Sequence, residues 1–82
     1  MREFPRVQSV EHFRAVLAKL EPQEGVIYYT GFLARDRQGS PALSEIANEA
    51  MRACSMGRCA LFQRRPAGSR SLNHFEYLAI GL

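Results

Sequence analysis

Arginine is the residue type in this chain best suited to holding a partner, and arginines gather near the C-terminus. Arg64 and Arg65 end one apolar run, and Arg70 follows in the loop "PAGSRSLN" at 66–73. Guanidinium groups bind phosphates and carboxylates through paired hydrogen bonds. Because a second apolar run follows the loop, the segment predicts a β-hairpin with a basic tip, which can hold phosphates or enter a minor groove.

Charge is unevenly distributed along the 82 residues. Residues 1–51 hold six Lys or Arg and seven Asp or Glu, whereas residues 52–82 hold five Arg and one Glu. This asymmetry favours nucleic acid or an acidic protein surface as the partner, although a solvated rim would give the same pattern. The candidate contact residues are Arg64, Arg65, Arg70, Arg58, Arg35, Arg37 and Asn73.

Catalysis has few candidate residues. The chain contains two histidines, His12 and His74, and one aspartate, Asp36. An imidazole titrates near neutral pH, but no pattern supplies an oriented base together with an oxyanion hole. The stretch "YTGFLARDR" has one glycine and no lysine, so it is not a phosphate-binding loop. We therefore expect a protein that is not an enzyme and has no cofactor.

Two cysteines and two histidines would suffice for a zinc site by number but not by spacing. Cys54 and Cys59 flank a helix-to-strand turn, in an arrangement that fits no common zinc pattern. We expect both thiols to be buried, reduced and free of metal. A disulfide would require an oxidising compartment, against which the absence of a signal peptide argues.

Length and composition indicate one small domain over residues 1–82, with residues 1–8 as a lead-in. Hydrophobic residues make up 46% of the chain and charged residues 23%, which is typical of globular proteins. A core of this size is thin, and a homodimer would add to it. No apolar run reaches the roughly 18 residues of a membrane span, and the N-terminus resembles no signal peptide. We expect a cytoplasmic protein with no membrane partner.

Two helices are expected to position these residues. Ser9 is a good N-cap for a first helix that ends near residues 21–22. Ser40 caps a second helix, Pro41 lies in its first turn and Gly57 terminates it. This second helix is expected to be continuous from about residue 42 to about residue 56. Its predicted apolar stripe consists of Leu43, Ile46, Ala47, Ala50 and Cys54.

Three strands complete the prediction, at residues 26–34, 59–65 and 74–82. Gly31 within the first strand suggests a bulge or a close backbone approach. The stretch "RDRQGSP" reads as a polar loop. The expected fold is α+β in the order α-β-α-β-β, with a three-stranded antiparallel sheet and two helices packed on it.

This order, with its basic loop between the last two strands, resembles the winged-helix topology. That resemblance implies nucleic-acid binding with residues 66–73 as the wing. A winged helix normally has two helices between its first and second strands, and here only one is expected. The outward face of that helix is expected to carry Glu45, Asn48, Glu49 and Arg52, and two glutamates would repel phosphate. The basic hairpin and the Arg35/Arg37 loop would then dominate the contact.

The segments "YYTGFLARDR" and "ALFQRR…FEYLAIG" also resemble short uncharacterised proteins of phages and prophages in GC-rich bacteria. This second resemblance implies action in the host cytoplasm. It leaves two hypotheses open. The first is a winged-helix-like accessory or regulatory protein that binds nucleic acid. The second is a phage inhibitor that binds and blocks a host protein complex, as anti-CRISPR proteins do.

Overall fold

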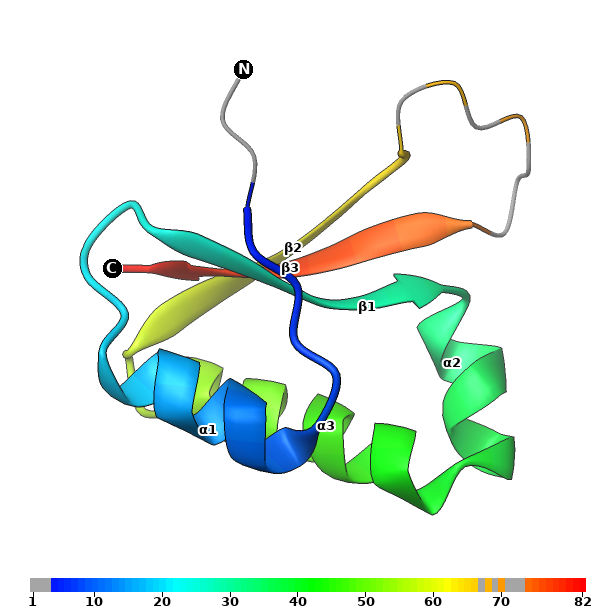
Figure 1. The fold of residues 1–82 in the computed structure, drawn as a ribbon, viewed down its shortest axis with the longest axis horizontal. Helices are drawn as coiled ribbons and strands as arrows, with labels where there is room; N and C mark the ends of the chain where they lie inside the picture. Colours follow the sequence, from blue (N-terminus) through cyan, green and yellow to red (C-terminus); the bar gives the residue numbers. More distant parts are fainter. Residues whose placement is uncertain (1–3, 67, 69, 71–73) are drawn as a thin grey trace.

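The fold is α+β, with helices on one side of a three-stranded antiparallel sheet (Figure 1). The computed structural model describes residues 4–66, 68, 70 and 74–82. The sheet has the strand order β1-β3-β2, so the C-terminal strands form the expected hairpin. The predicted fold class and element order are confirmed. The elements are α1 (Val10–Ala18), β1 (Gly25–Gly31), α2 (Leu33–Asp36), the 3-10 helix η1 (Arg37–Gly39), α3 (Pro41–Ser55), β2 (Cys59–Arg64) and β3 (Phe75–Gly81).

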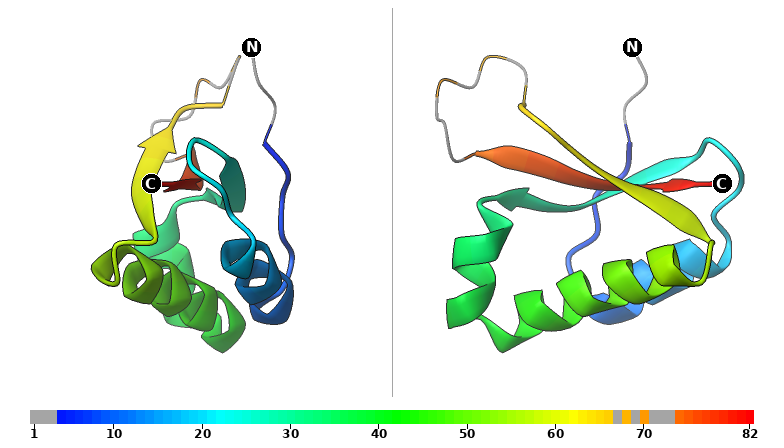
Figure 2. Two further views of the ribbon diagram at one scale, coloured as in Figure 1. Left: turned by 90° about the vertical axis from the view of Figure 1, so that its left-hand side faces the viewer. Right: turned by 180° about the vertical axis from the view of Figure 1, so that it is seen from behind.

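The core lies between the sheet and the two longer helices. α1 lies below β1 and α3 lies below β2, as the end-on view in Figure 2 shows. In β2 and β3 every second residue points toward the helices, because strand side chains alternate between the two faces. β1 departs from this alternation at a register shift between Ile27 and Tyr29, where Tyr28 lies in the core and Tyr29 packs against it. The buried cluster includes Phe13 and Leu17 from α1, Ile46, Ala50 and Ala53 from α3, and Val26, Tyr28, Cys59, Tyr77 and Ala79 from the sheet.

Caps set the ends of the two longer helices as the sequence predicts. The Ser9 hydroxyl accepts a hydrogen bond from the His12 amide at 3.1 Å, and the Ser40 hydroxyl accepts one from the Leu43 amide at 3.2 Å. Gly57 follows α3 with φ +75°, a conformation that glycine adopts without strain. α3 is one unbroken helix, as predicted. α1 ends at Ala18, about three residues earlier than predicted.

The prediction was wrong for residues 32–39, where the structure has a second helical segment instead of a strand end and a loop. β1 ends at Gly31, and α2 with η1 occupies residues 33–39. Gly31 has φ +145°, which turns the chain out of the sheet. The Asp36 carboxylate then accepts the Phe32 amide hydrogen bond at 3.2 Å. A Cβ at Gly31 would lie 2.9 Å from Asp36 Oδ2, so the predicted close approach is real.

The face of α3 also differs from the prediction at two positions. Ala53 is buried where Cys54 was expected, and Cys54 is exposed. Glu49 was expected on the outward face but is only 7% exposed. Burying a carboxylate is costly unless it is paired, and Glu49 is paired with two arginines. The expected repulsive pair of Glu45 and Glu49 on the outward face is therefore absent.

The N-terminal segment is more than a lead-in, because part of it covers the outer edge of β1. The Pro5 carbonyl accepts the Ile27 amide at 2.8 Å, and the Ile27 carbonyl accepts the Val7 amide at 3.1 Å. This parallel pairing leaves β2 as the uncovered edge of the sheet among the described strands. None of the helices in the described ranges is long and apolar enough to cross a membrane.

Candidate nucleic-acid interface

Two of the candidate arginines lie against aromatic rings at the end of the sheet from which the hairpin loop emerges. The Arg65 guanidinium lies 5.7 Å from the centre of the Phe75 ring, and that of Arg35 lies 5.6 Å from the centre of the Phe32 ring. Gly31, which precedes Phe32, lies opposite Phe75 in the sheet register. The sheet therefore brings two arginine–aromatic pairs, from α2 and from the end of β2, to one end of the molecule.

A hydrogen-bond network around Asp36 fixes α2 at this end. Asp36 Oδ2 accepts the Tyr29 hydroxyl at 2.5 Å, and Asp36 Oδ1 accepts Arg35 Nε at 2.9 Å. The Tyr29 hydrogen bond, aided by Arg35, lowers the pKa of Asp36. The same bond raises the pKa of Tyr29 to about 12. Arg35 is thus held in place by its neighbour while its side chain stays 64% exposed.

Arg64 differs from Arg65 because it is tied to the open face of the sheet, the face away from the helices. Its Nε donates to Glu76 Oε1 at 2.9 Å, and Arg6 donates to Glu76 Oε2 at 2.6 Å. The Arg64 guanidinium also lies 5.5 Å from the centre of the Phe4 ring. Burial alone would raise the pKa of Glu76, but the two arginines lower it overall. Arg64 therefore stabilises the fold by pairing with Glu76, and its side chain is still 42% exposed at the surface.

The remaining candidate residues are dispersed. Arg37 turns away toward α3, where it donates to Asn48 at 2.8 Å and to Ser44 at 3.3 Å. Arg58 is exposed at the opposite end of β2. Arg70 is exposed in the loop. The last candidate, Asn73, lies outside the described residues, as do parts of the 66–73 loop.

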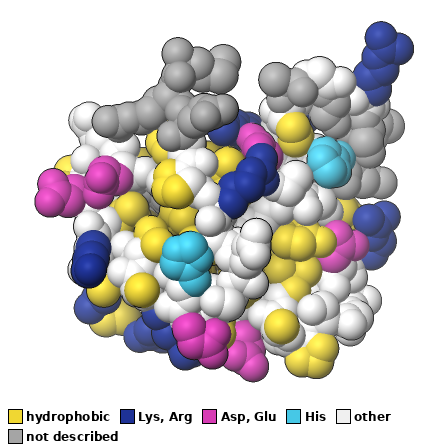
Figure 3. Space-filling model, in the orientation of Figure 1, with side chains coloured by type: hydrophobic (Ala, Val, Ile, Leu, Met, Phe, Trp, Pro, Cys, Tyr) yellow, Lys and Arg dark blue, Asp and Glu magenta, His cyan; other side chains and the backbone are white. Residues whose placement is uncertain are grey.

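The hairpin end carries the larger excess of positive charge. Among the described residues it has five arginines, Arg6, Arg35, Arg64, Arg65 and Arg70, against two carboxylates, Asp36 and Glu76. The surplus of three positive charges equals the net charge of the whole chain. In Figure 3, Lys and Arg side chains occur around the hairpin at the upper right and again at the lower left.

The second group of basic residues was not predicted from the sequence. Arg14 of α1 and Arg52 of α3 both bind the buried carboxylate of Glu49, with Arg14 Nε at 3.2 Å. Arg58 and Met56 join them around a small cleft of about 130 Å³. The contact between Arg14 and Glu49 spans 35 residues, so no local sequence pattern would reveal it. The hydrogen bonds of both arginines lower the pKa of Glu49 although burial opposes this.

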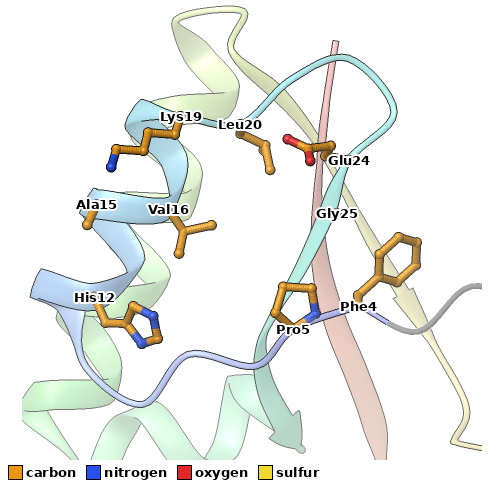
Figure 4. A pocket seen from close by; sticks show the side chains of 9 residues that line it. All are labelled: Phe4, Pro5, His12, Ala15, Val16, Lys19, Leu20, Glu24 and Gly25. Atoms are coloured by element: carbon orange, nitrogen blue, oxygen red, sulfur yellow. The ribbon is translucent and has the colours of Figure 1, made fainter.

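A larger hollow of about 530 Å³ lies between α1, the N-terminal segment and the start of β1. Figure 4 shows Val16 and Leu20 pointing into it, opposite Pro5. His12 and Glu24 also point into the hollow, whereas Lys19 points away. The lining is thus mainly apolar, with one imidazole and one carboxylate at its borders.

The two cysteines are both free, but their surroundings differ. Cys59 is buried in the core, and burial raises the pKa of its thiol. Cys54 is exposed, so the prediction of two buried thiols holds for Cys59 alone. Among the described residues, no three His, Cys, Asp or Glu side chains lie together as metal ligands would.

Comparison with protein-family models, curated protein sequences and solved structures found no match to this chain.

Proposed function

We propose that this chain is a winged-helix-like protein that binds nucleic acid with the hairpin end of its sheet. The observation that carries the proposal is the grouping of Arg35, Arg65 and Arg70 at that end. Arg70 is exposed, and the other two lie on aromatic rings. Exposed guanidinium groups bind phosphates, and aromatic rings beside them offer a surface on which bases stack.

The order of the elements supports the same proposal. The helical segment at residues 33–39 precedes α3, so two helical segments lie between β1 and β2, as in a winged helix. The sequence had led us to expect only one helix between these strands, so the extra segment supports the winged-helix reading. The outward face of α3 also opposes phosphate less than expected, because Glu49 is buried and paired. The hairpin end, with its surplus of positive charge, remains the main contact.

Salt dependence of DNA binding tests this proposal. Fluorescence anisotropy with duplex and single-stranded DNA would be measured at several salt concentrations. If Arg35, Arg65 and Arg70 each neutralise one phosphate of a duplex, the log–log slope is about −2.7. Arg65→Ala and Arg70→Ala should each reduce its magnitude by about one unit.

Arg58→Ala is the matched control, because Arg58 is exposed but lies at the other end of β2. It should leave the slope unchanged. Absence of binding to both forms of DNA at low salt would contradict the proposal. If Arg58→Ala and Arg65→Ala reduced the slope equally, DNA binding would depend on the total positive charge and not on the hairpin end.

A second candidate function is that of a phage inhibitor which binds an acidic surface of a host protein. The arginine–aromatic pairs favour it as well, since Arg and aromatic residues are enriched at the energetic centres of protein interfaces. In that case Arg35→Ala and Arg65→Ala would weaken capture of the host protein without any requirement for DNA. Salt would then act mainly on the association rate.

A further inference from the structure

We infer that the open edge of β2 is a dimer interface, at which a second copy of this chain adds its own β2 antiparallel to the first. The two edges of the sheet differ. The edge of β1 is covered by the backbone of residues 5–7. The edge of β2 has no covering strand among the described residues. An uncovered edge offers a row of unpaired N–H and C=O groups to another strand.

The composition of β2 does not protect this edge. Natural proteins block open edges with prolines, charged residues or bulges. β2 reads CALFQR, so Arg64 at its end is its only charged residue, and it pairs with β3 without a bulge. Phe62, at the middle of the strand, is 53% exposed. A large exposed side chain beside free backbone groups favours pairing with a further strand.

Other exposed apolar residues flank the same edge. Met51 belongs to α3, which lies below β2 in the end-on view of Figure 2, whereas Met56 lines the cleft between α1 and α3. Leu82 lies beside the start of β2, since its amide donates to the Arg58 carbonyl at 3.3 Å. Within the described ranges, the exposed large hydrophobic residues are Met51, Met56, Phe62 and Leu82. Two of these four residues, Phe62 and Leu82, thus lie on β2 or beside it.

The partner is a second copy because β2 can pair with itself without opposing like charges. A two-fold axis perpendicular to the sheet makes the strands antiparallel and keeps each face of the sheet continuous. With the axis at Phe62, the two Phe62 side chains lie opposite each other. Ala60 of each chain then faces Arg64 of the other. A register centred on Leu61 would instead place Arg58 opposite Arg64.

The geometry of the hairpin agrees with this register. The Arg58 carbonyl points toward β3, because it accepts the Leu82 amide. In an antiparallel ladder, inward and outward backbone groups alternate along the strand. The outward groups therefore belong to Cys59, Leu61 and Gln63. The register centred on Phe62 pairs the outward groups of Leu61 with those of Gln63 and makes Phe62 a non-hydrogen-bonded pair, in which side chains approach most closely.

Analytical ultracentrifugation of the full chain is the first test. At high protein concentration, we expect a mass twice the 9.3 kDa of one chain. Phe62→Asp should give the single-chain mass with an unchanged circular dichroism spectrum, because it places two carboxylates opposite each other and Phe62 is outside the core. A single-chain mass for the wild type at millimolar concentration would overturn the inference.

Disulfide trapping tests the register. In a Cys54→Ser background, Phe62→Cys should yield a covalent dimer on oxidation, because Cα atoms of a non-hydrogen-bonded pair are about 4.5 Å apart. Gln63→Cys in the same background is the matched control. Gln63 is exposed like Phe62, but in this register it faces Leu61 of the partner. The two Gln63 residues are therefore not opposite each other. Equal trapping of both variants, or trapping of Gln63→Cys alone, would contradict the register. These results do not depend on whether the chain binds nucleic acid.

Discussion

Glu76 and Glu49 occupy comparable positions in different parts of the molecule. Each is 7% exposed, and each binds two arginines. Glu76 joins the N-terminal segment to the hairpin through Arg6 and Arg64, which are 70 and 12 residues away. Glu49 joins α1 to α3 through Arg14, while its other partner, Arg52, is three residues along the same helix. A buried glutamate between two arginines therefore joins the N-terminal segment to the hairpin at Glu76, whereas at Glu49 it acts within the pair of helices α1 and α3.

The largest effect is expected at Glu76. Glu76→Ala leaves Arg6 and Arg64 without their shared partner and removes one of the contacts that hold the N-terminal segment on the sheet, while its backbone hydrogen bonds to Ile27 remain. Removing one member of a buried ion pair costs about 3–5 kcal/mol, but both arginines are about half exposed. We therefore expect the free energy of unfolding to fall by about 2 kcal/mol in urea denaturation. A loss no greater than that of Glu45→Ala, an exposed control, would contradict this.

A smaller effect is expected at Glu49. Glu49→Ala removes the contact with Arg14, which joins α1 to α3. It also removes the pair with Arg52, but a pair three residues apart on one helix contributes little to stability. We expect a loss of about 1 kcal/mol. The same urea series with Glu45→Ala measures it. A larger loss than in Glu76→Ala would mean that contacts within the helical layer contribute more than those across the sheet.

Acid should weaken both ties. Because the arginines lower the pKa of Glu76 and of Glu49, each contributes stability above the unfolded-state pKa of about 4.3, and this is lost as the pH falls through the lower folded value. The urea midpoints of the wild type and of Glu76→Gln should therefore converge below about pH 4. A constant difference down to about pH 2 would show that the ion pair is not the cause.

The smallest effect on stability is expected at Asp36, the more exposed carboxylate of the hairpin end. Asp36→Asn replaces the charged carboxylate acceptor by a neutral amide oxygen, which weakens the interaction that raises the pKa of Tyr29 to about 12, so Tyr29 should ionise closer to its usual pH. Tyr28, whose pKa burial raises to about 12, is the internal control. Ultraviolet titration of tyrosinate measures both. The hydrogen bond favours the neutral phenol, so its contribution is fully present below about pH 10 and is lost as the pH rises through the folded pKa of about 12.

Local signals explain how much of the fold could be predicted. Ser40, Pro41 and Gly57 fixed α3 to within about a residue at each end, since caps act over a few residues. The three strands followed from β-rich runs. The helix at residues 33–36 was missed because "FLA" suits either a strand or a helix, and the turn at Gly31 decides between them.

The candidate site was less predictable, because contacts with residues distant in sequence determine where each arginine side chain lies. Arg64 and Arg65 are adjacent in sequence, yet Arg64 binds Glu76 on the open face while Arg65 lies over Phe75. Arg58 joins Arg14 and Arg52 at the opposite end. The helical period alone could not predict whether Glu49 is buried or exposed, because this residue lies at the border of the buried face formed by positions 46, 50 and 53.

The contrast between the two thiols allows the opening of the sheet to be timed. Cys54 is exposed on α3 and should react with a thiol reagent at once, whereas Cys59, 1% exposed at the start of β2, can react only when β2 separates from the core. A Cys54→Ser chain would therefore carry one thiol whose labelling rate reports the frequency of that separation. Binding that holds β2 closed would slow the labelling, so one native atom can register both local unfolding and its suppression by a partner.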